Sequence, residues 1–276
     1  MWWLVLFLSV FSIALRAPVA IAAASIARTI VVDLKGGGDF KSIQQAIDSV
    51  PDNNNKWTKI HVAAGVYSLM SLYWMQNTYN GFANLTPAVA AWILGDKSAF
   101  YDCSFIGFQD TLADMLGRHY FKGCYIEGVV DFIFGYGQSI YERCKISTVK
   151  SLQKPGYVTA QGRNSASDNG GFVFKSCTIS GPQATYLGRA WRHSSRVIFY
   201  QTFMSDIIVP AGWRIWNAQG YEGLVTFAES GCAGPGSDLS GRVKWEKQLR
   251  NDELKTFIDI SYIDGEGWLD AQPPLD

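Results

Sequence analysis

A short pattern of apolar positions recurs along the middle of the chain. Each copy has an aromatic residue three positions before a cysteine and another apolar residue two positions after it. Four segments show the complete pattern, AFYDCSFIG, HYFKGCYIEG, SIYERCKIS and FVFKSCTIS, centred on Cys103, Cys124, Cys144 and Cys177. A fifth segment, VIFYQTFMS, has Thr202 in the cysteine position. Successive centres are 21, 20, 33 and 25 residues apart, so the pattern is an internal repeat.

A repeat near twenty residues, built from alternating β-type stretches with Gly or Asn turns, predicts a solenoid of stacked β-rungs. One rung cannot bury its inward face alone, so the rungs stack and like residues form ladders. The longer steps are expected to be rungs that carry extended loops. We interpret the four cysteines as a buried ladder of small hydrophobic side chains, in preference to disulfides. Cys232 falls outside the pattern, and its state stays open.

The segments on either side of the repeat predict end structures. TIVVD (29–33) is typical of a strand, and DFKSIQQAIDSV (39–50) of an amphipathic helix with Asp39 as its N-cap. The expected apolar face of that helix consists of Phe40, Ile43, Ala46, Ile47 and Val50. Such a helix would cap the open edge of the first rung. The stretch 252–269 predicts a helix and a loop that dock on the outside.

Composition narrows the class of protein. The 276 residues are 48% hydrophobic, which suits one globular domain with a large core. The 24 basic residues balance the 24 acidic ones and form no basic run, which argues against a nucleic-acid partner. Aromatic residues make up 14% of the chain, an excess that suits a protein stacking on sugar rings.

The first 24 residues predict a signal peptide, which leaves 25–276 as the mature domain. The run MWWLVLFLSVFSIAL is short for a membrane span, and Ala20, Ala22 and Ala24 offer A-x-A cleavage sites. A membrane anchor is the alternative that we consider less favoured. Secretion would make Asn84, in the sequon NLT, a glycosylation site.

Two aspartates share one place in the repeat. Asp110 follows Cys103 by seven residues, and Asp131 follows Cys124 by seven. If the rungs stack in register, the two carboxyl groups lie on adjacent strands, about 4.8 Å apart. Two carboxylates that close do not ionise together, so one becomes a neutral acid and the other a charged nucleophile or base. The alternative is that each Asp caps a turn, but a pair at equivalent positions favours chemistry.

Other catalytic signatures are missing from the sequence. It contains no G-x-S-x-G, H-E-x-x-H, P-loop or C-x-x-C motif. The three histidines, His61, His119 and His193, are scattered, and we interpret His119 as structural. A Ser-His-Asp triad and a zinc site are therefore unsupported.

Five ordered motifs around these residues resemble plant pectin methylesterases. They are GFQDTL (107–112), DFIFG (131–135), YVTAQGR (157–163), LGRAW (187–191) and GWRIW (212–216). The similarity extends from about Thr29 to Leu269. This family implies an all-β fold, a single-stranded right-handed parallel β-helix, here with an N-terminal capping helix. It also implies a carboxylic ester hydrolase that releases methanol from pectin.

The resemblance assigns a role to each matching site residue. It implies that Asp131 is the nucleophile that attacks a galacturonate C6 methyl ester, and that Asp110 protonates departing methanol and then activates water. Gln109 would donate to the oxyanion, and Arg189 would pair with Asp131. Trp191 and Trp213 would line the cleft and stack on sugar rings. Gln161 would either contact substrate or satisfy a turn.

The family also implies partners and a location. No metal and no organic cofactor is expected, because carboxylates do the covalent work. The expected partner is methyl-esterified homogalacturonan of the cell wall, with a proteinaceous pectinesterase inhibitor as a further candidate. The protein is expected to be a secreted monomer with no affinity for membranes.

Three departures from the family pattern raise alternatives. Pro87 stands where the family motif QAVAL has a glutamine, a second oxyanion donor, and losing such a donor costs on the order of 10²–10³ in rate. Leu69 replaces a glutamate, and the chain is shortened near 68–78, between Tyr67 and Asn77. A catalytically impaired pectin-binding β-helix is therefore one alternative. A β-helix glycosidase that uses the Asp pair is another, although LGRAW and QDTL speak against it.

Overall fold

The computed structural model describes residues 27–33, 35–51, 58–62, 67–68, 74–76, 85–152 and 154–272. The predicted signal peptide, Asn84, Leu69 and most of the stretch 68–78 lie outside these residues.

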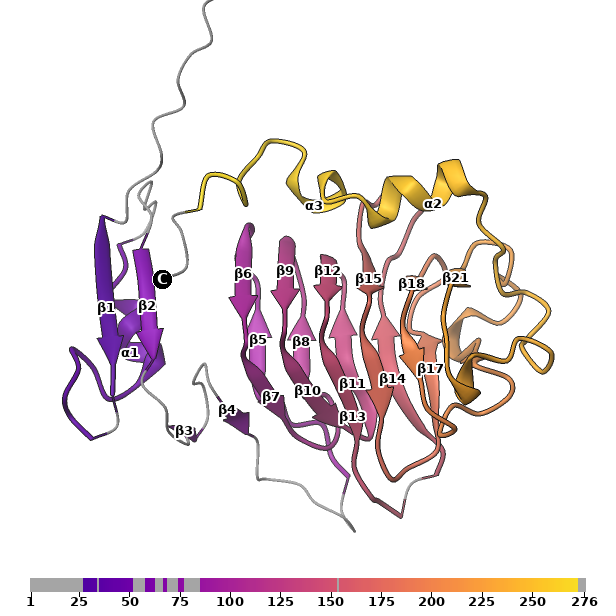
Figure 1. Cartoon of the computed structure of the whole chain (residues 1–276), viewed down its shortest axis with the longest axis horizontal. Coiled ribbons are helices and arrows are strands. Elements are labelled where there is room, and N and C mark those ends of the chain that lie inside the picture. The colour runs from indigo at the N-terminus through magenta and orange to yellow at the C-terminus, as the bar shows by residue number, and fades with distance from the viewer. Residues whose placement is uncertain are drawn as a thin grey trace, which may run out of the picture.

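Three parallel sheets wrap around one interior, and each is named here after one of its strands (Figure 1). The β10 sheet contains β3 (Tyr67–Ser68), β4 (Trp74–Gln76), β7 (Ser104–Ile106), β10 (Tyr125–Gly128), β13 (Lys145–Thr148), β16 (Thr178–Ser180) and β19 (Phe203–Met204). The β11 sheet contains β5 (Ala91–Ile93), β8 (Leu112–Asp114), β11 (Val130–Gly135), β14 (Gly156–Gln161), β17 (Thr185–Ala190) and β20 (Trp213–Arg214). The β12 sheet contains β6 (Ser98–Tyr101), β9 (Arg118–Lys122), β12 (Gln138–Glu142), β15 (Gly171–Lys175), β18 (Arg196–Tyr200) and β21 (Thr226–Ser230). The chain visits the sheets in turn, so the predicted solenoid of β-rungs is confirmed.

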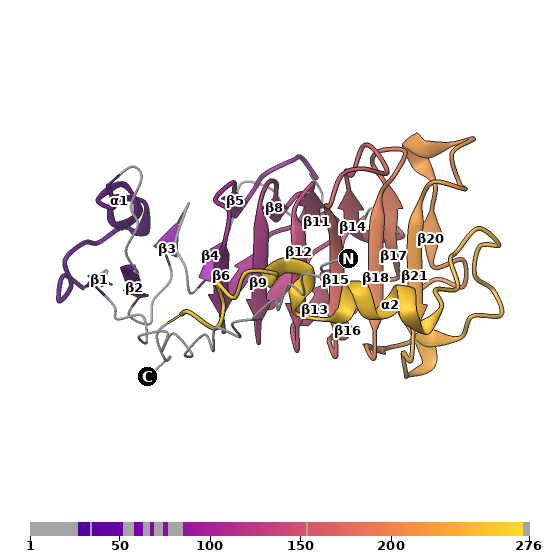
Figure 2. The ribbon, with the colours of Figure 1, turned by 90° about the horizontal axis from the view of Figure 1, so that it is seen from above.

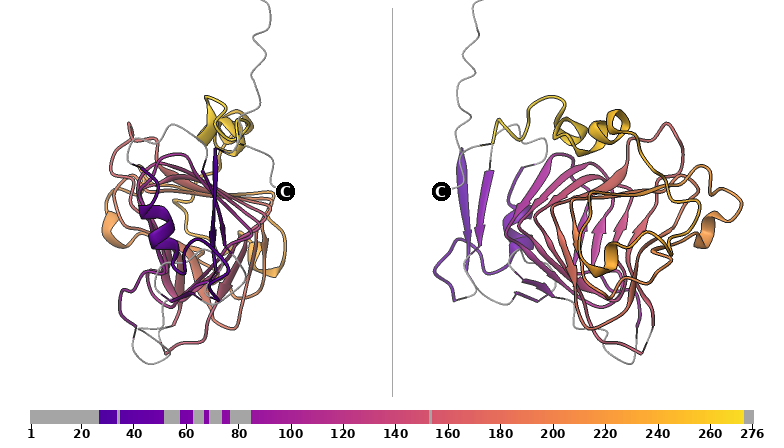
Figure 3. Two further views of the ribbon diagram at one scale, coloured as in Figure 1. Left: turned by 90° about the vertical axis from the view of Figure 1, so that its left-hand side faces the viewer. Right: turned by 45° about the vertical axis from the view of Figure 1, so that its right-hand side comes forward.

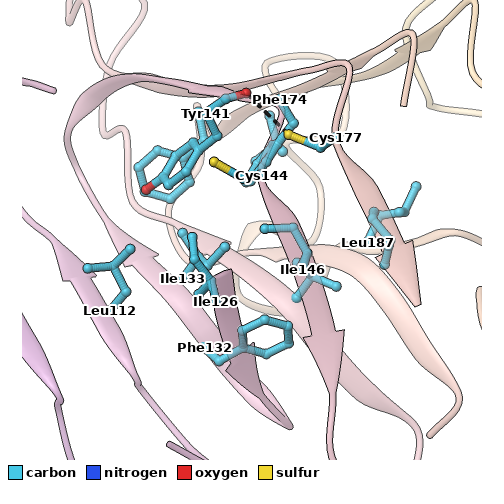
Figure 4. Packing of buried hydrophobic residues seen from close by; sticks show 14 of the residues in the cluster. Leu112, Ile126, Phe132, Ile133, Tyr141, Cys144, Ile146, Phe174, Cys177 and Leu187 are labelled. Atoms are coloured by element: carbon cyan, nitrogen blue, oxygen red, sulfur yellow. Dashed lines mark hydrogen bonds between the residues drawn. The ribbon is translucent and has the colours of Figure 1, made fainter. Parts of the chain in front are cut away.

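The interior contains the ladders that the repeat predicts (Figure 4). The aromatic residues before the cysteine positions stack face to face from Phe100 through Phe121, Tyr141 and Phe174 to Phe199, with ring centroids 4.5–4.9 Å apart. Cys103, Cys124, Cys144 and Cys177 are buried free thiols. Each cysteine therefore packs as a small hydrophobic side chain, as predicted.

Cys232 belongs to this ladder, which corrects the interpretation that it lies outside the repeat. It follows β21 by two residues, as Cys177 follows β15 by two. Its thiol donates to the carbonyl of Phe199 at 3.5 Å, as the thiol of Cys177 donates to that of Tyr141 at 3.3 Å. The sequence pattern missed this copy because Glu229 and Gly234 occupy its aromatic and apolar positions.

The residue before each ladder position turns the chain from the β12 sheet into the β10 sheet. This residue has a positive φ in all six described copies, Asp102, Gly123, Arg143, Ser176, Gln201 and Gly231. Gly231 before Cys232 thus matches Gly123 before Cys124. That shared Gly-Cys pair is the signal in the sequence that could have identified the sixth copy.

A small cap lies at the N-terminal end of the solenoid (Figure 3). Strands β1 (Arg28–Val32) and β2 (Thr58–Val62) pair in parallel, and α1 (Ile43–Asp48) packs Ile43 and Ala46 against them. The predicted N-cap was wrong, because Ser42 holds that position and the Asp39 carboxylate accepts from the Val31 amide at 2.8 Å. Ile47 is also not on the buried face, since it is 45% exposed.

The C-terminal segment docks on the outside of the solenoid, as predicted (Figure 2). Helices α2 (Asn251–Ile258) and α3 (Ser261–Asp264) cover the outer face of the β12 sheet. Leu254, Ile263 and Trp268 pack there against Tyr120, Ile140, Val173, Ile198 and Ala228. Two single 3-10 turns, η1 (Trp216–Ala218) and η2 (Pro235–Ser237), complete the regular elements of the described chain. Within that part of the chain, no helix has the length and apolar character of a membrane span.

Candidate active site

Asp110 and Asp131 lie opposite each other on adjacent rungs. The register between the rungs aligns Gln109 with Val130 and Leu112 with Ile133, and the two aspartates lie at matching places between these pairs. Both have a left-handed backbone, with φ of 60° and 48°, a conformation that Asp tolerates better than most residues. The repeat spacing therefore predicted this juxtaposition correctly.

The apolar residues after Asp131 do not all surround its carboxylate. Phe132 and Ile133 both point into the solenoid interior, because the β11–β14 register shifts between Val130 and Ile133. This irregularity turns Asp131 outward while its two successors stay inside. Phe134 lies on the outer face, in a separate apolar cluster. Of the three, only Phe134 shares the outer face with Asp131.

Arg189 on β17 holds the Asp131 carboxylate. Its Nε donates to one carboxylate oxygen at 2.8 Å and its terminal amino group donates to the other at 2.5 Å. The register neighbour of Arg189 on the intervening strand β14 is Ala160, and the guanidinium reaches across that strand over the Tyr157 ring. The pair is well shielded from solvent, since the side chains of Arg189 and Asp131 are 16% and 8% exposed. A bidentate pair of this kind fixes the orientation of the carboxylate.

Two aromatic rings sandwich the Arg189 guanidinium. Its central carbon lies 4.3 Å from the ring centroid of Tyr157 and 3.7 Å from that of Trp216. Tyr157 is itself stacked on Tyr186, with centroids 5.2 Å apart. Cation–π contacts of this geometry stabilise a guanidinium in a partly desolvated place. Sequence reasoning missed Tyr157 and Trp216, although both lie inside motifs that it singled out.

The two carboxyl groups have different electrostatic surroundings. Burial, and then the negative charge of Asp131, raise the pKa of Asp110 from 3.8 to about 7, and Arg189 opposes this effect. Burial also raises the pKa of Asp131, but the hydrogen bonds and charge of Arg189 act in the opposite direction. The negative charge of Asp131 thus helps to keep the proton on Asp110. Near neutral pH a protonated Asp110 can lie beside an ionised Asp131.

Gln109 and Pro87 lie on neighbouring rungs beside the pair. The Gln109 side chain is half-buried and makes no hydrogen bond within the described residues. The Ala88 amide donates to the Gln109 carbonyl at 3.2 Å, which aligns the segment PAVAA with the strand before Asp110. Pro87 is exposed at the start of that segment and has no hydrogen-bond donor. Of the two positions, Gln109 and Pro87, only Gln109 thus offers a side-chain amide donor beside the aspartate pair.

The three tryptophans of the motifs LGRAW and GWRIW have different surroundings. Trp191 follows β17 and packs its half-buried ring beside Tyr136 and Phe134 on the outer face of the β11 sheet. Trp213 does not line a cleft, which corrects the expectation from the motif. It is 1% exposed and packs in the interior against Phe199 and Phe227, because its place on β20 points inward. Trp216, three residues later, is the outward-facing tryptophan of this motif.

Two other residues considered at the sequence level have structural contacts. The Gln161 side-chain oxygen accepts from the amides of Arg163 at 2.9 Å and Arg196 at 2.8 Å, so it satisfies a turn. His119 is fully buried and bonds Asp114 at 2.5 Å and the Gly95 carbonyl at 2.9 Å. Both residues therefore organise the solenoid itself.

A polar pocket of about 370 Å³ lies apart from the aspartates, at the turns that lead from the β11 sheet to the β12 sheet. Its lining includes Asp96, Arg118, Tyr136, Gln138 and Asn169 and none of the predicted catalytic residues. Within the described ranges, no group of three or more His, Cys, Asp or Glu side chains is arranged to hold a metal ion.

Comparisons with known proteins agree on one family. A family model described as Pectinesterase matches residues 74–266. The curated relatives include Probable pectinesterase 55 of Arabidopsis thaliana, 42% identical over 88% of this chain and 91% of its own length. Probable pectinesterase 29 of the same plant is 41% identical over 88% of this chain and 89% of its own.

Solved structures show the same architecture. A pectin methylesterase from carrot matches with a TM-score of 0.78 and 27% identity, covering 92% of this chain and 99% of its own. The pectin methylesterase from Aspergillus niger matches with a TM-score of 0.69 and 25% identity, over 90% and 97% of the two chains. The right-handed parallel β-helix that the sequence predicted is thereby confirmed.

Proposed function

The chain belongs to the pectinesterase family, and we propose that it hydrolyses the C6 methyl esters of galacturonate units in pectin. The observation that carries this proposal is the register-matched pair of Asp110 and Asp131, with Arg189 bound to Asp131 through both carboxylate oxygens. Arg189 orients the Asp131 carboxylate and favours its ionised form against the effect of burial, and Asp110 has a pKa of about 7. That combination supplies a nucleophile and an acid at one pH.

The first half of the reaction transfers the acyl group to the protein. An oxygen of the Asp131 carboxylate attacks the ester carbonyl carbon, and the carbonyl oxygen becomes an oxyanion. The side-chain amide of Gln109 donates a hydrogen bond to that oxyanion. As the carbon–oxygen bond to the methoxy group breaks, Asp110 gives its proton to the leaving oxygen and methanol departs. The product is an anhydride between Asp131 and galacturonate.

The second half returns the protein to its starting state. Asp110, now ionised, takes a proton from water as the water oxygen attacks the galacturonyl carbon of the anhydride. The bond to Asp131 breaks, which releases the Asp131 carboxylate and the galacturonic acid product. Arg189 stabilises the Asp131 carboxylate both before attack and as it leaves.

Methanol release from methyl-esterified pectin tests this function. We expect the wild-type protein to release methanol, and Asp131→Asn to release none above the uncatalysed background. A suitable control is Asp102→Asn, the same substitution at an exposed left-handed turn with φ of 52°. Methanol release that survives Asp131→Asn would exclude this mechanism, and no release by the wild type would exclude the function.

A pectin-binding protein without turnover is the second candidate, and Pro87 is the observation that favours it. If the donor missing at this position is the main defect, Pro87→Gln should raise methanol release by on the order of 10²–10³. Calorimetry with oligogalacturonides would show whether the wild type binds them. Binding by both proteins with methanol release by neither would favour the binding role.

The remaining parts of the proposal concern location and partners. We infer a secreted protein of the plant cell wall that acts on methyl-esterified homogalacturonan as a monomer, with a proteinaceous pectinesterase inhibitor as a candidate partner. A fluorescent fusion of the full chain, viewed after the cell is shrunk away from its wall, tests the location. Size-exclusion chromatography with light scattering tests the monomer.

A further inference from the structure

Arg214 is an exposed arginine beside the proposed catalytic residues. It lies on β20, and the parallel register aligns it with Arg189 on β17. Register partners in neighbouring parallel strands point to the same face of the sheet. Since Arg189 points outward to Asp131, Arg214 also points outward, and it is exposed to solvent. Arg214 thus lies on the same outer face as the candidate site, one strand beyond Arg189.

Tyr157 connects the two arginines. Its hydroxyl accepts a hydrogen bond from a terminal nitrogen of Arg214 at 2.5 Å. The guanidinium carbons of Arg189 and Arg214 lie 4.3 Å and 6.0 Å from the centroid of the Tyr157 ring. The Arg214 guanidinium therefore reaches back over the sheet toward Asp131, and the tyrosine holds it there.

Arg214 differs from two other arginines, Arg189 and Arg242, because no carboxylate of the described residues pairs with it. Arg189 is neutralised by Asp131 and the buried Arg242 by Glu229. Within the described ranges, no carboxylate oxygen lies within 4.0 Å of an Arg214 nitrogen. Its bond to Tyr157 uses one of five N–H donors and no negative charge. Arg214 thus presents an uncompensated cation and several free donors beside the site.

We propose that Arg214 binds the free carboxylate of a galacturonate unit near the one being hydrolysed. This inference rests on the proposed function. A methyl ester is neutral, whereas each unit already hydrolysed carries a carboxylate. A guanidinium matches a carboxylate through two parallel hydrogen bonds, which an ester cannot provide equally well. Arg214 therefore makes partly de-esterified pectin the better substrate, and each hydrolysis creates a binding group for the next.

Hexameric oligogalacturonides that differ in methyl-esterification test the proposal. Methanol release is measured at low salt on the fully esterified oligomer and on a partly de-esterified one. We expect kcat/KM per ester group to be roughly tenfold higher on the partly de-esterified oligomer, as for one hydrogen bond to a charged group. Raising the ionic strength should shrink that ratio, because Arg214 is exposed.

Two variants and a control separate recognition of charge from a structural role. Arg214→Gln should bring the ratio close to one, whereas Arg214→Lys should retain most of it. Lys122→Gln removes one exposed positive charge from β9, in a different sheet, and should leave the ratio unchanged. If Arg214 only supports Tyr157, Arg214→Gln will slow both oligomers equally, which overturns the inference.

A binding measurement keeps the test independent of turnover. Calorimetry with the fully de-esterified oligomer should show roughly tenfold weaker binding to Arg214→Gln than to the wild type. Methanol release without preference for charge would overturn this inference and leave the proposed function intact. If no oligomer yields methanol, the proposed hydrolase function is wrong. Equal binding of the de-esterified oligomer to the wild type and to Arg214→Gln overturns the role of Arg214 as well.

Discussion

Asp110→Asn should make the folded protein more stable at alkaline pH. In the folded state the pKa of Asp110 is about 7, whereas its ordinary value of 3.8 applies to the unfolded chain. Because the folded-state pKa is the higher one, the folded protein holds the Asp110 proton more tightly than the unfolded chain does. The stability that this proton contributes is fully present below about pH 4. It is lost as the pH rises through about 7, where the wild-type carboxyl group ionises beside Asp131. Asparagine does not ionise and avoids this loss.

The magnitude follows from the change in pKa. Raising the pKa from 3.8 to about 7 corresponds to about 4 kcal/mol of unfolding free energy. Asp110 is only partly buried, and solvent screening reduces this value to about 2 kcal/mol. For a chain of this size that is a rise in Tm of about 4–8 °C.

Urea unfolding of the wild type and Asp110→Asn at pH 4 and pH 8 measures the effect. We expect the variant to gain about 2 kcal/mol relative to the wild type between the two pH values. Asp102→Asn, at an exposed turn, should show no such gain. A difference between variant and wild type that is the same at both pH values would refute the raised pKa of Asp110, which burial and then the charge of Asp131 produce. The stabilised variant should also lose methanol release, as expected for strain held at an active site.

Three further outcomes follow from the same geometry. Methanol release by the wild type should fall as the pH rises through about 7, because Asp110 must be protonated to give its proton to departing methanol. A rate that keeps rising to alkaline pH contradicts the role of Asp110 as the acid. Trp216→Leu should lower kcat by roughly five- to tenfold, because it removes one of the two rings that contact the Arg189 guanidinium. An unchanged kcat would show that the contact between Trp216 and Arg189 has no catalytic effect. Trp213→Ala should reduce the unfolding free energy by about 3–5 kcal/mol in urea titrations, because this ring fills the interior; a stable variant with a raised KM would instead support its original assignment to the cleft.

The sequence alone was sufficient for the fold and for the central pair. Inward-facing residues of a solenoid repeat at rung spacing, because every rung must bury the same face against its neighbours. The period therefore predicts that Cys103 lies beside Cys124 and Asp110 opposite Asp131 on adjacent rungs, and the strand register agrees. The five motifs pointed to the family, which the comparisons then showed.

The orientation of individual side chains was decided only by the tertiary structure. Trp213 and Trp216 lie three residues apart in one motif, yet the strand turns the first inward and the 3-10 turn places the second over Arg189. Likewise, a local shift in register sends Phe132 and Ile133 inward and leaves Asp131 outside. A single strand pattern cannot show such reversals, because the face of a side chain changes with each one-residue shift in register, and neighbouring strands set that register.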